Sequence, residues 1–221
     1  MTNVRTLLVL GASGDLASRL LLPALGQLLA AEPERQLRLV GAGAEQLTAE
    51  DWTDLLRTAF TADGEPGTAL DAVLGDTAYV QADVTSESDP RDLLNECEDD
   101  TAIYFALPPA ITVKACEALQ RTGVPAGTVL ALEKPFGSSA ESAHDLNELL
   151  LRIVPETHIH RVDHFLGRST VLNLLGVRFA NRMLEPVWNS QHIARVDIVY
   201  DEQLGLRTVP ATTTTPAPWS T

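Results

Sequence analysis

Short apolar runs alternate with longer amphipathic segments along the first 160 residues of this sequence. The apolar run at 4–10 predicts a parallel strand that is covered on both faces. Further strands are predicted at 36–40, within 76–83, and at 101–107, 128–132 and 157–162. The segments between them predict helices at 16–31, 48–60, 89–95, 110–121 and 138–153. Parallel strands need crossover helices, so the alternation predicts an α/β fold with a Rossmann-type, doubly wound parallel sheet.

The pattern changes after residue 160. Helical spacing of Val171, Leu174, Leu175 and Phe179 predicts a helix at 167–181, and alternation at 193–201 predicts a strand of a second sheet. We therefore expect a dinucleotide-binding domain at 1–160 and only the beginning of an α+β substrate domain at 161–206. The Thr, Pro and Ala bias at 207–221 cannot fill a core and predicts a disordered tail.

Individual polar residues indicate where two of the predicted helices begin. Thr48 precedes Glu50 and Asp51, which predicts an N-cap followed by an acidic first turn. Ser138 lies three residues before Glu141, which predicts a capping box.

The net charge of −14 excludes nucleic acids and anionic membranes as good partners. An anionic small molecule would therefore need a local cationic site. The longest apolar run, at 20–31, contains a proline and is too short to span a bilayer. With two cysteines, which we expect to be free thiols, these features indicate a cytoplasmic protein. We expect no metal site.

A glycine turn follows the first strand and opens the first helix. Residues 11–17 read Gly-Ala-Ser-Gly-Asp-Leu-Ala. Glycines let the backbone approach a pyrophosphate, and a helix N-terminus offers free N–H groups. A tight turn without any ligand is the alternative. Arg19, one turn further, is either a phosphate contact or a solvated helix residue.

Charged groups gather at the ends of the last two predicted strands. Lys134 lies in Glu-Lys-Pro-Phe-Gly at 133–137, and residues 161–168 read Arg-Val-Asp-His-Phe-Leu-Gly-Arg. Pro135 biases Lys134 away from helical angles, which favours projection of its ammonium off the strand end. Arg161 and Arg168 carry forks suited to phosphate or carboxylate, and His164 can donate to a phosphate or move a proton.

Taken together, the glycine turn, the Glu-Lys-Pro-Phe-Gly segment and the Asp163-His164 segment resemble the glucose-6-phosphate dehydrogenase family. The resemblance runs from about residue 7 to about residue 206. It implies hydride transfer from C1 of glucose 6-phosphate to NADP, the first oxidative step of the pentose phosphate pathway. It also implies that full-length members form homo-oligomers.

The resemblance assigns roles residue by residue. Substrate binding falls on Lys134, His164, Arg168 and Glu202. Asp163 would orient a general-base histidine, and Lys134 would contact both substrate and cofactor. Cofactor binding falls on Gly11, Ala12, Ser13, Gly14, Asp15, Leu16, Arg19, Ala44, Glu45, Tyr104, Pro108 and Lys134.

Several positions depart from the family pattern. Ala44 stands where the family places the arginine that pairs the 2′-phosphate of NADP, and Glu45 follows it. A carboxylate there would repel that phosphate, and it could accept from the 2′-hydroxyl of NAD; the alternative is that Glu45 merely faces water. NAD is therefore a possible cofactor beside NADP. Arg168 and Phe165 replace a lysine and a tyrosine.

The family pattern stops at Leu206. The segment with the general-base histidine has no counterpart in this sequence, so we expect little turnover from this chain. Shifting the reading frame by one nucleotide from Val209 permits Gly-Ala-Gly-Tyr-Tyr-Asp, which resembles the family sequence. We therefore interpret the tail as a reading-frame slip or a pseudogene end. The rival function is a non-enzymatic dinucleotide-binding module.

Overall fold

The computed structural model describes residues 4–62, 69–86, 89–97, 100–163 and 165–199. The chain divides into two units, residues 1–164 and residues 165–221.

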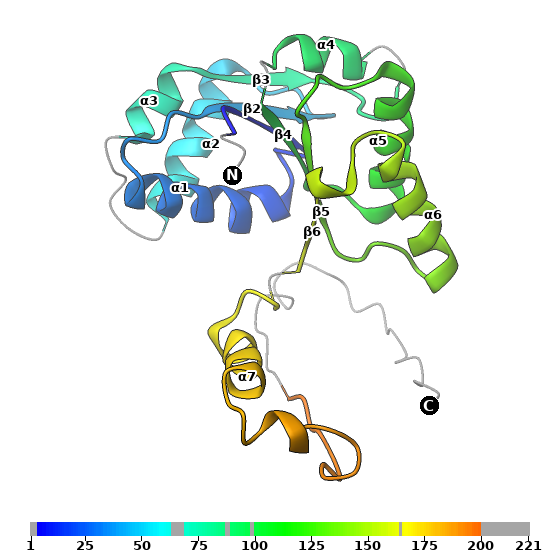
Figure 1. Cartoon of the computed structure of the whole chain (residues 1–221). Coiled ribbons are helices and arrows are strands. Elements are labelled where there is room, and N and C mark those ends of the chain that lie inside the picture. Colours follow the sequence, from blue (N-terminus) through cyan, green and yellow to red (C-terminus); the bar gives the residue numbers. More distant parts are fainter. Residues whose placement is uncertain (1–3, 63–68, 87–88, 98–99, 164, 200–221) are drawn as a thin grey trace. The chain divides into compact units, whose positions relative to one another are not determined.

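A six-stranded, fully parallel sheet forms the centre of the first unit (Figure 1). Its strands lie in the order β3-β2-β1-β4-β5-β6, so the chain reverses its direction of travel across the sheet between β1 and β4. This order confirms the predicted Rossmann-type fold and places the ligand-binding switch point at the carboxyl ends of β1 and β4. The strand bounds are β1 Thr6–Leu10, β2 Arg38–Gly43, β3 Thr77–Gln81, β4 Thr101–Phe105, β5 Val129–Glu133 and β6 Ile159–Val162.

Two hydrophobic cores lie on opposite faces of the sheet. Val9 and Leu39 pack with Trp52 on the face covered by α1, α2 and α3, whereas Leu8 and Phe105 pack on the face covered by α4, α5 and α6 (Figure 1). Successive strand residues point to opposite faces, so burial on both sides requires the continuous apolar runs of the sequence. The helix bounds are α1 Leu22–Ala31, α2 Ala49–Thr61, α3 Ala69–Gly75, α4 Asp89–Asn95, α5 Pro109–Thr122 and α6 Ala140–Leu151.

Helix starts follow the sequence signals with two differences. Thr48 is the expected N-cap of α2, and it also forms a reciprocal capping box with Asp51, which was not predicted. The cap of α6 is Ser139 with Ser142, not Ser138 with Glu141. The small Ser142 hydroxyl reaches the N–H of Ser139 at 3.0 Å, so no carboxylate is needed.

The helix predicted at 16–31 begins with a π-helical turn, Ala17–Leu21. Helix α3 was not predicted, and within the described ranges no helix is long and apolar enough to cross a bilayer.

In its described part, residues 165–199, the second unit contains helix α7 at Ser169–Phe179, which confirms the helix predicted at 167–181, and a 3-10 turn at Glu185–Val187. The predicted strand at 193–201 is wrong for its described part: residues 194–199 have no regular secondary structure. Val196 and Ile198 are 70% and 81% exposed. A strand needs a hydrogen-bonded neighbour, and the described part of this unit contains none.

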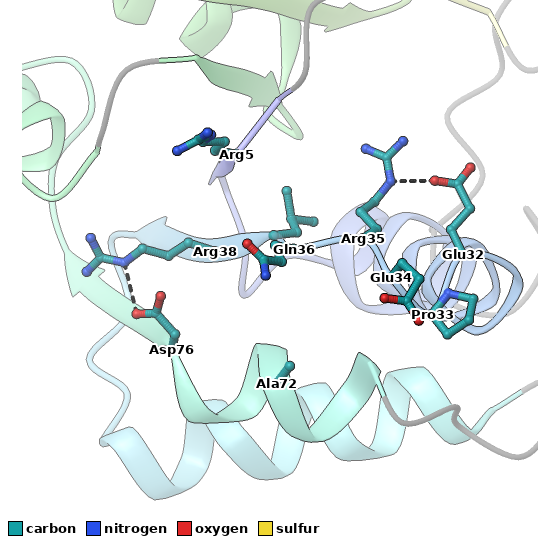
Figure 2. Close-up of a pocket in the computed structure, with 10 residues that line it drawn as sticks. Arg5, Glu32, Pro33, Glu34, Arg35, Gln36, Arg38, Ala72 and Asp76 are labelled. Carbon is teal, nitrogen blue, oxygen red and sulfur yellow. Dashed lines mark hydrogen bonds and ion pairs between the residues drawn. The ribbon is translucent and has the colours of Figure 1, made fainter.

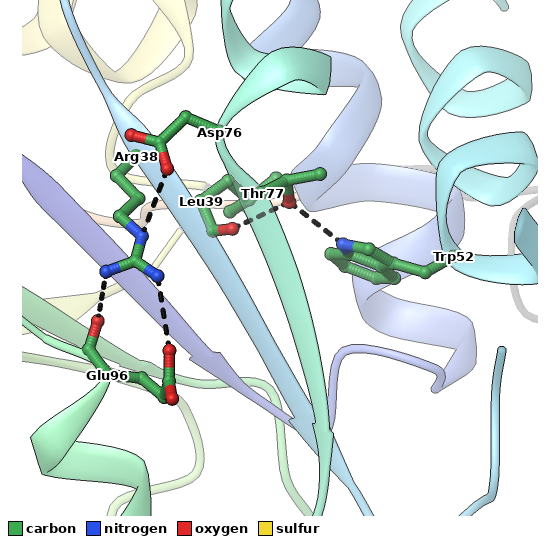
Figure 3. A network of polar contacts seen from close by, with 6 residues as sticks. All are labelled: Arg38, Leu39, Trp52, Asp76, Thr77 and Glu96. Carbon is green, nitrogen blue, oxygen red and sulfur yellow. Dashed lines mark hydrogen bonds and ion pairs between the residues drawn. The ribbon is translucent and has the colours of Figure 1, made fainter. Parts of the chain in front are cut away.

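A buried indole ties the outer strand of the sheet to helix α2. The Trp52 side chain is 1% exposed, and its Nε1 donates to Thr77 Oγ1 at 2.9 Å (Figure 3). The same hydroxyl donates to the carbonyl of Leu39 at 2.7 Å. Thr77 therefore satisfies one buried donor and one strand carbonyl at once.

Replacing Thr77 with valine keeps the side-chain shape but leaves the Trp52 N–H without its acceptor. We expect Thr77→Val to lower the free energy of unfolding by about 1–3 kcal/mol, the usual cost of an unsatisfied buried polar group. Thr77→Ser, which keeps the hydroxyl, should lose less. Urea denaturation followed by tryptophan fluorescence measures both, and equal losses would contradict the role given to the hydroxyl.

Candidate functional site at the carboxyl edge of the sheet

Most of the predicted site residues of the first unit follow strand ends on one edge; Tyr104 lies within β4, and Arg19 lies in the first helical segment. Residues 11–16 follow β1, residues 44 and 45 follow β2, Pro108 follows β4, Lys134 follows β5 and Asp163 follows β6. Since all six strands are parallel, these ends share the carboxyl edge. The fold thereby brings together residues that are up to 152 positions apart in the sequence.

The turn after β1 needs a glycine at position 11. Gly11 has a φ of +83°, and a Cβ there would lie 2.4 Å from the carbonyl oxygen of Ala106, which follows β4. The N–H groups of Gly11 and Ala12 both donate to the carbonyl of Ala42, at 2.8 and 3.0 Å. The base of the turn is therefore fixed to β2 on one side and crowded by β4 on the other.

The upper part of the turn carries the groups that a phosphate requires. In the described part of the chain, the backbone N–H groups of Ser13, Asp15 and Leu16 donate to no protein acceptor. Gly14 is bound back to the turn, through its N–H and the Gly11 carbonyl at 3.0 Å. Free N–H groups at a helix start favour an anion, so the turn fits the pyrophosphate of a dinucleotide.

Arg19 and Asp15 are paired with each other on the outer side of this helix start. The Arg19 guanidinium contacts the Asp15 carboxylate at 3.0 Å, and Asp15 is largely exposed. Leu16 instead packs toward the core beside α1, and Ala12 is buried. Of these predicted cofactor residues, Ala12 and Leu16 shape the turn, and Arg19 can meet a phosphate only after leaving Asp15.

Ala44 and Glu45 are exposed at the end of β2. The preceding residue, Gly43, has no room for a side chain: a Cβ would lie 2.8 Å from the Tyr79 hydroxyl and 3.0 Å from Ser13 Oγ. The loop of residues 44 and 45 therefore lies directly beside the glycine turn. A loop that contacts the adenosine ribose of a cofactor bound at this turn has to lie there.

Lys134 and Asp163 meet at the ends of β5 and β6. Their side chains form an ion pair of 2.9 Å, and both remain partly accessible, at 35% and 27% exposure. The N–H of Lys134 donates to the Val162 carbonyl at 3.3 Å, which extends the strand pairing to the site. The Lys134–Pro135 peptide bond is cis.

The Arg161 guanidinium is not available to bind an anion at the carboxyl edge, contrary to the interpretation made from the sequence. Its side chain binds Glu156 at 2.8 Å and also Asn147 of α6. This contact lowers the pKa of Glu156 below its ordinary range. The pairing assigns Arg161 a structural role between β6 and its neighbours.

A hydrogen bond between Tyr104 and Glu133 was missed by sequence reasoning. The Tyr104 hydroxyl of β4 donates to Glu133 Oε1, and Glu133 directly precedes Lys134. Burial, and next the acceptance by Glu133, raises the pKa of Tyr104 well above its ordinary value of about 10. Strand register could have revealed the pair, because Tyr104 lies opposite Ala131 and Glu133 is two residues further on the same face.

Three predicted substrate residues cannot be placed at this edge. His164 and Glu202 lie outside the described residues. Arg168 belongs to the second unit, where its guanidinium stacks over the Phe165 ring at 5.0 Å.

The opposite, amino edge of the sheet carries an open depression of about 1020 Å³ (Figure 2). Two of its three arginines are engaged by acidic neighbours: Arg35 pairs with Glu32 at 2.6 Å, and Arg38 contacts Asp76 at 3.4 Å and Glu96 at 3.2 Å. Figure 3 shows Arg38 held between the last two. The carboxyl edge is therefore the better candidate site.

Cys97 and Cys116 take no part in the site. Both are free thiols, as predicted. Burial raises the pKa of Cys97 to about 11 and that of Cys116 to about 12. Both side chains therefore stay neutral and unreactive near neutral pH.

Comparison with known proteins agrees with this geometry. Residues 8–173 match the family model described as glucose-6-phosphate dehydrogenase, NAD binding domain. A glucose-6-phosphate 1-dehydrogenase of Rhizobium meliloti is 35% identical over 90% of this chain and 42% of its own length. One from Zymomonas mobilis is 34% identical over 93% of this chain and 44% of its own length.

Solved structures show the same fold. A glucose-6-phosphate 1-dehydrogenase from Mycobacterium avium aligns with a TM-score of 0.72 at 32% identity, covering 86% of this chain and 42% of that one. A glucose-6-phosphate dehydrogenase in complex with glucose-6-phosphate aligns with a TM-score of 0.71 at 26% identity, covering 86% and 43%. The present chain thus spans less than half the length of the relatives it matches.

The raised pKa of Tyr104 predicts a pH dependence. A tyrosine that stays protonated in the folded state contributes stability that is complete below its unfolded pKa, about 10, and is lost as the pH rises toward the folded value. We expect the free energy of unfolding to fall above pH 10, and to fall less steeply in Tyr104→Phe.

Absorbance at 295 nm against pH gives a second measure. The folded wild type should retain one tyrosine that ionises well above pH 10, and Tyr104→Phe should lack it. A normal titration of every tyrosine in the folded wild type would contradict the Tyr104–Glu133 contact.

Proposed function

Because the chain belongs to the glucose-6-phosphate dehydrogenase family, we propose that it binds NADP at the turn of residues 11–16 and takes part in the oxidation of glucose 6-phosphate at C1. Its relatives are named for that activity, and the chain spans 42% of the length of the Rhizobium meliloti relative. The proposal therefore concerns the part of the reaction that the described residues can perform.

One observation carries the proposal: an anion-binding turn and a lysine–aspartate pair lie on one edge of the sheet. The turn follows β1, and Lys134 follows β5; only β4 lies between these two strands. Neighbouring strands are about 4.8 Å apart, so the two strand ends are separated by roughly 10 Å. A dinucleotide whose pyrophosphate occupies the turn can extend over this distance toward Lys134.

The side chains suit the proposed substrate. When bound, the nicotinamide ring would accept the hydride. The Lys134 ammonium offers a positive charge and three donors to a sugar phosphate, and Asp163 holds that ammonium in place at 2.9 Å. By the resemblance of its sequence segment to the family, His164 would add a further substrate contact, and Asp163 would orient a general base that has no counterpart in this sequence.

The loop after β2 governs the choice between NADP and NAD. Ala44 brings no positive charge to a 2′-phosphate, and the exposed Glu45 carboxylate is close in sequence. We propose that the chain binds NADP with a smaller preference over NAD than an arginine at position 44 would provide. We also propose a cytoplasmic location, since a relative from Arabidopsis thaliana is named cytoplasmic.

Isothermal titration of the 221-residue chain with NADP⁺ and with NAD⁺ tests the cofactor site directly. We expect saturable binding that Gly11→Ala weakens at least about tenfold, because the new Cβ would press on the Ala106 carbonyl in a strained conformation. Gly75→Ala is the matched control, since a Cβ at Gly75 meets nothing within 4 Å. Absence of binding to the folded wild type would refute the proposal.

Absorbance at 340 nm in the same mixtures, after glucose 6-phosphate is added, separates an enzyme from the rival binding module. Turnover that Lys134→Met abolishes is the result expected of an enzyme site. Binding of cofactor without any turnover would favour the non-enzymatic module, in line with the low turnover expected from the sequence.

A further variant tests the cofactor preference. Ala44→Arg should tighten NADP⁺ binding by about tenfold, the effect of one charge-assisted hydrogen bond, and leave NAD⁺ binding within about twofold. Ala62→Arg adds the same charge to the exposed far end of α2 and should leave the ratio of the two affinities unchanged. Equal tightening by both variants would show a long-range charge effect instead.

A further inference from the structure

The loop that follows β2 is held in place by two side chains of β3. The Tyr79 hydroxyl donates to the carbonyl oxygen of Glu45 at 2.9 Å, and the Gln81 side-chain amide donates to that of Ala44 at 3.1 Å. These are two consecutive carbonyl groups of the exposed loop. Both are therefore turned toward β3.

The orientation of the carbonyls determines that of the amides. The peptide bonds Ala44–Glu45 and Glu45–Gln46 are trans. Among the described residues, the peptide bond in the cis form is Lys134–Pro135. In a planar trans peptide the N–H points opposite to the C=O. The N–H groups of Glu45 and Gln46 thus point away from β3, and within the described ranges neither donates to a protein acceptor.

The held loop is adjacent to the glycine turn. The Tyr79 hydroxyl and Ser13 Oγ both lie about 3 Å from where a Gly43 Cβ would stand, at 2.8 and 3.0 Å. The Tyr79 ring is itself fixed against Trp52, with centroids 5.4 Å apart. A rigid path therefore runs from the buried core through Tyr79 to the loop beside Ser13.

We propose that Tyr79, assisted by Gln81, is a positioning residue that sets the preference of this site for a 2′-phosphorylated adenosine. The inference rests on the proposed cofactor site. With both carbonyls held against β3, the loop presents two unpaired N–H groups to the 2′ position, which suits a phosphate. A released loop can turn its carbonyl oxygens outward, where they repel a phosphate and accept from a 2′-hydroxyl.

The test uses adenosine 2′,5′-bisphosphate and 5′-AMP, which differ only in the 2′-phosphate, alongside NADP⁺ and NAD⁺. Isothermal titration of the full chain gives each affinity without requiring turnover. We expect Tyr79→Phe to lower the preference for the 2′-phosphorylated ligand about three- to tenfold in each pair, the range of one exposed hydrogen bond. The affinity for 5′-AMP should stay within about twofold.

Two further variants guard against a purely structural effect. Gln81→Met removes only the second donor and should shift the preference in the same direction by a smaller factor. Thr128→Val removes a hydroxyl that donates to the Pro125 carbonyl at 2.8 Å, before β5 and away from the loop, and should lower the melting temperature without changing the preference.

The outcomes separate this inference from the proposed function. An unchanged preference in both Tyr79→Phe and Gln81→Met, with wild-type binding intact, overturns the inference and leaves the cofactor site standing. A preference lowered equally by Thr128→Val also overturns it, since a general loss of stability would then suffice. A folded wild-type chain that binds none of the four ligands refutes the proposed function and this inference together.

Discussion

The close approach of the β1 turn to β4 is the constraint on which the site depends. A Cβ at residue 11 would lie 2.4 Å from the Ala106 carbonyl, so the two strands can run side by side to their ends only if that residue has no side chain. The same geometry turns the N–H groups of Gly11 and Ala12 toward the Ala42 carbonyl. What remains for a ligand is the outer part of the turn, and its position is set by backbone packing rather than by any charged side chain.

Most of the sheet could be predicted from sequence because its signal is local. A strand buried on both faces must be apolar at nearly every position, and Leu8, Val9 and Leu10 are all less than 3% exposed. The second sheet could not be predicted in this way. Alternation at residues 193–201 describes how a strand would face its neighbours, but it does not supply a neighbour, and the described part of the second unit offers none.

The chemistry of the site was only partly predictable, for a related reason. Lys134 and Asp163 can be identified from the sequence, because each follows a predicted strand and lies in a segment that resembles the family. That they form an ion pair depends on the register of β5 and β6, which places Glu133 opposite Val162. The Tyr104–Glu133 and Tyr79–Glu45 contacts also join segments that are 29 and 34 residues apart. Such pairs follow from strand order and register, which local patterns do not determine.

Charge explains why backbone groups matter so much here. The chain carries a net charge of −14, and several of its guanidiniums are already held by carboxylates, such as Arg19 by Asp15 and Arg161 by Glu156. An anionic ligand that relied on such side chains would have to break these pairs. Backbone N–H groups at a helix start and in a restrained loop carry a fixed partial charge and are not themselves held in ion pairs. In an acidic protein, restraint of the backbone by Gly11 and Tyr79 is therefore a direct means of binding a phosphate, and Lys134 supplies the localised positive charge at the far end of the edge.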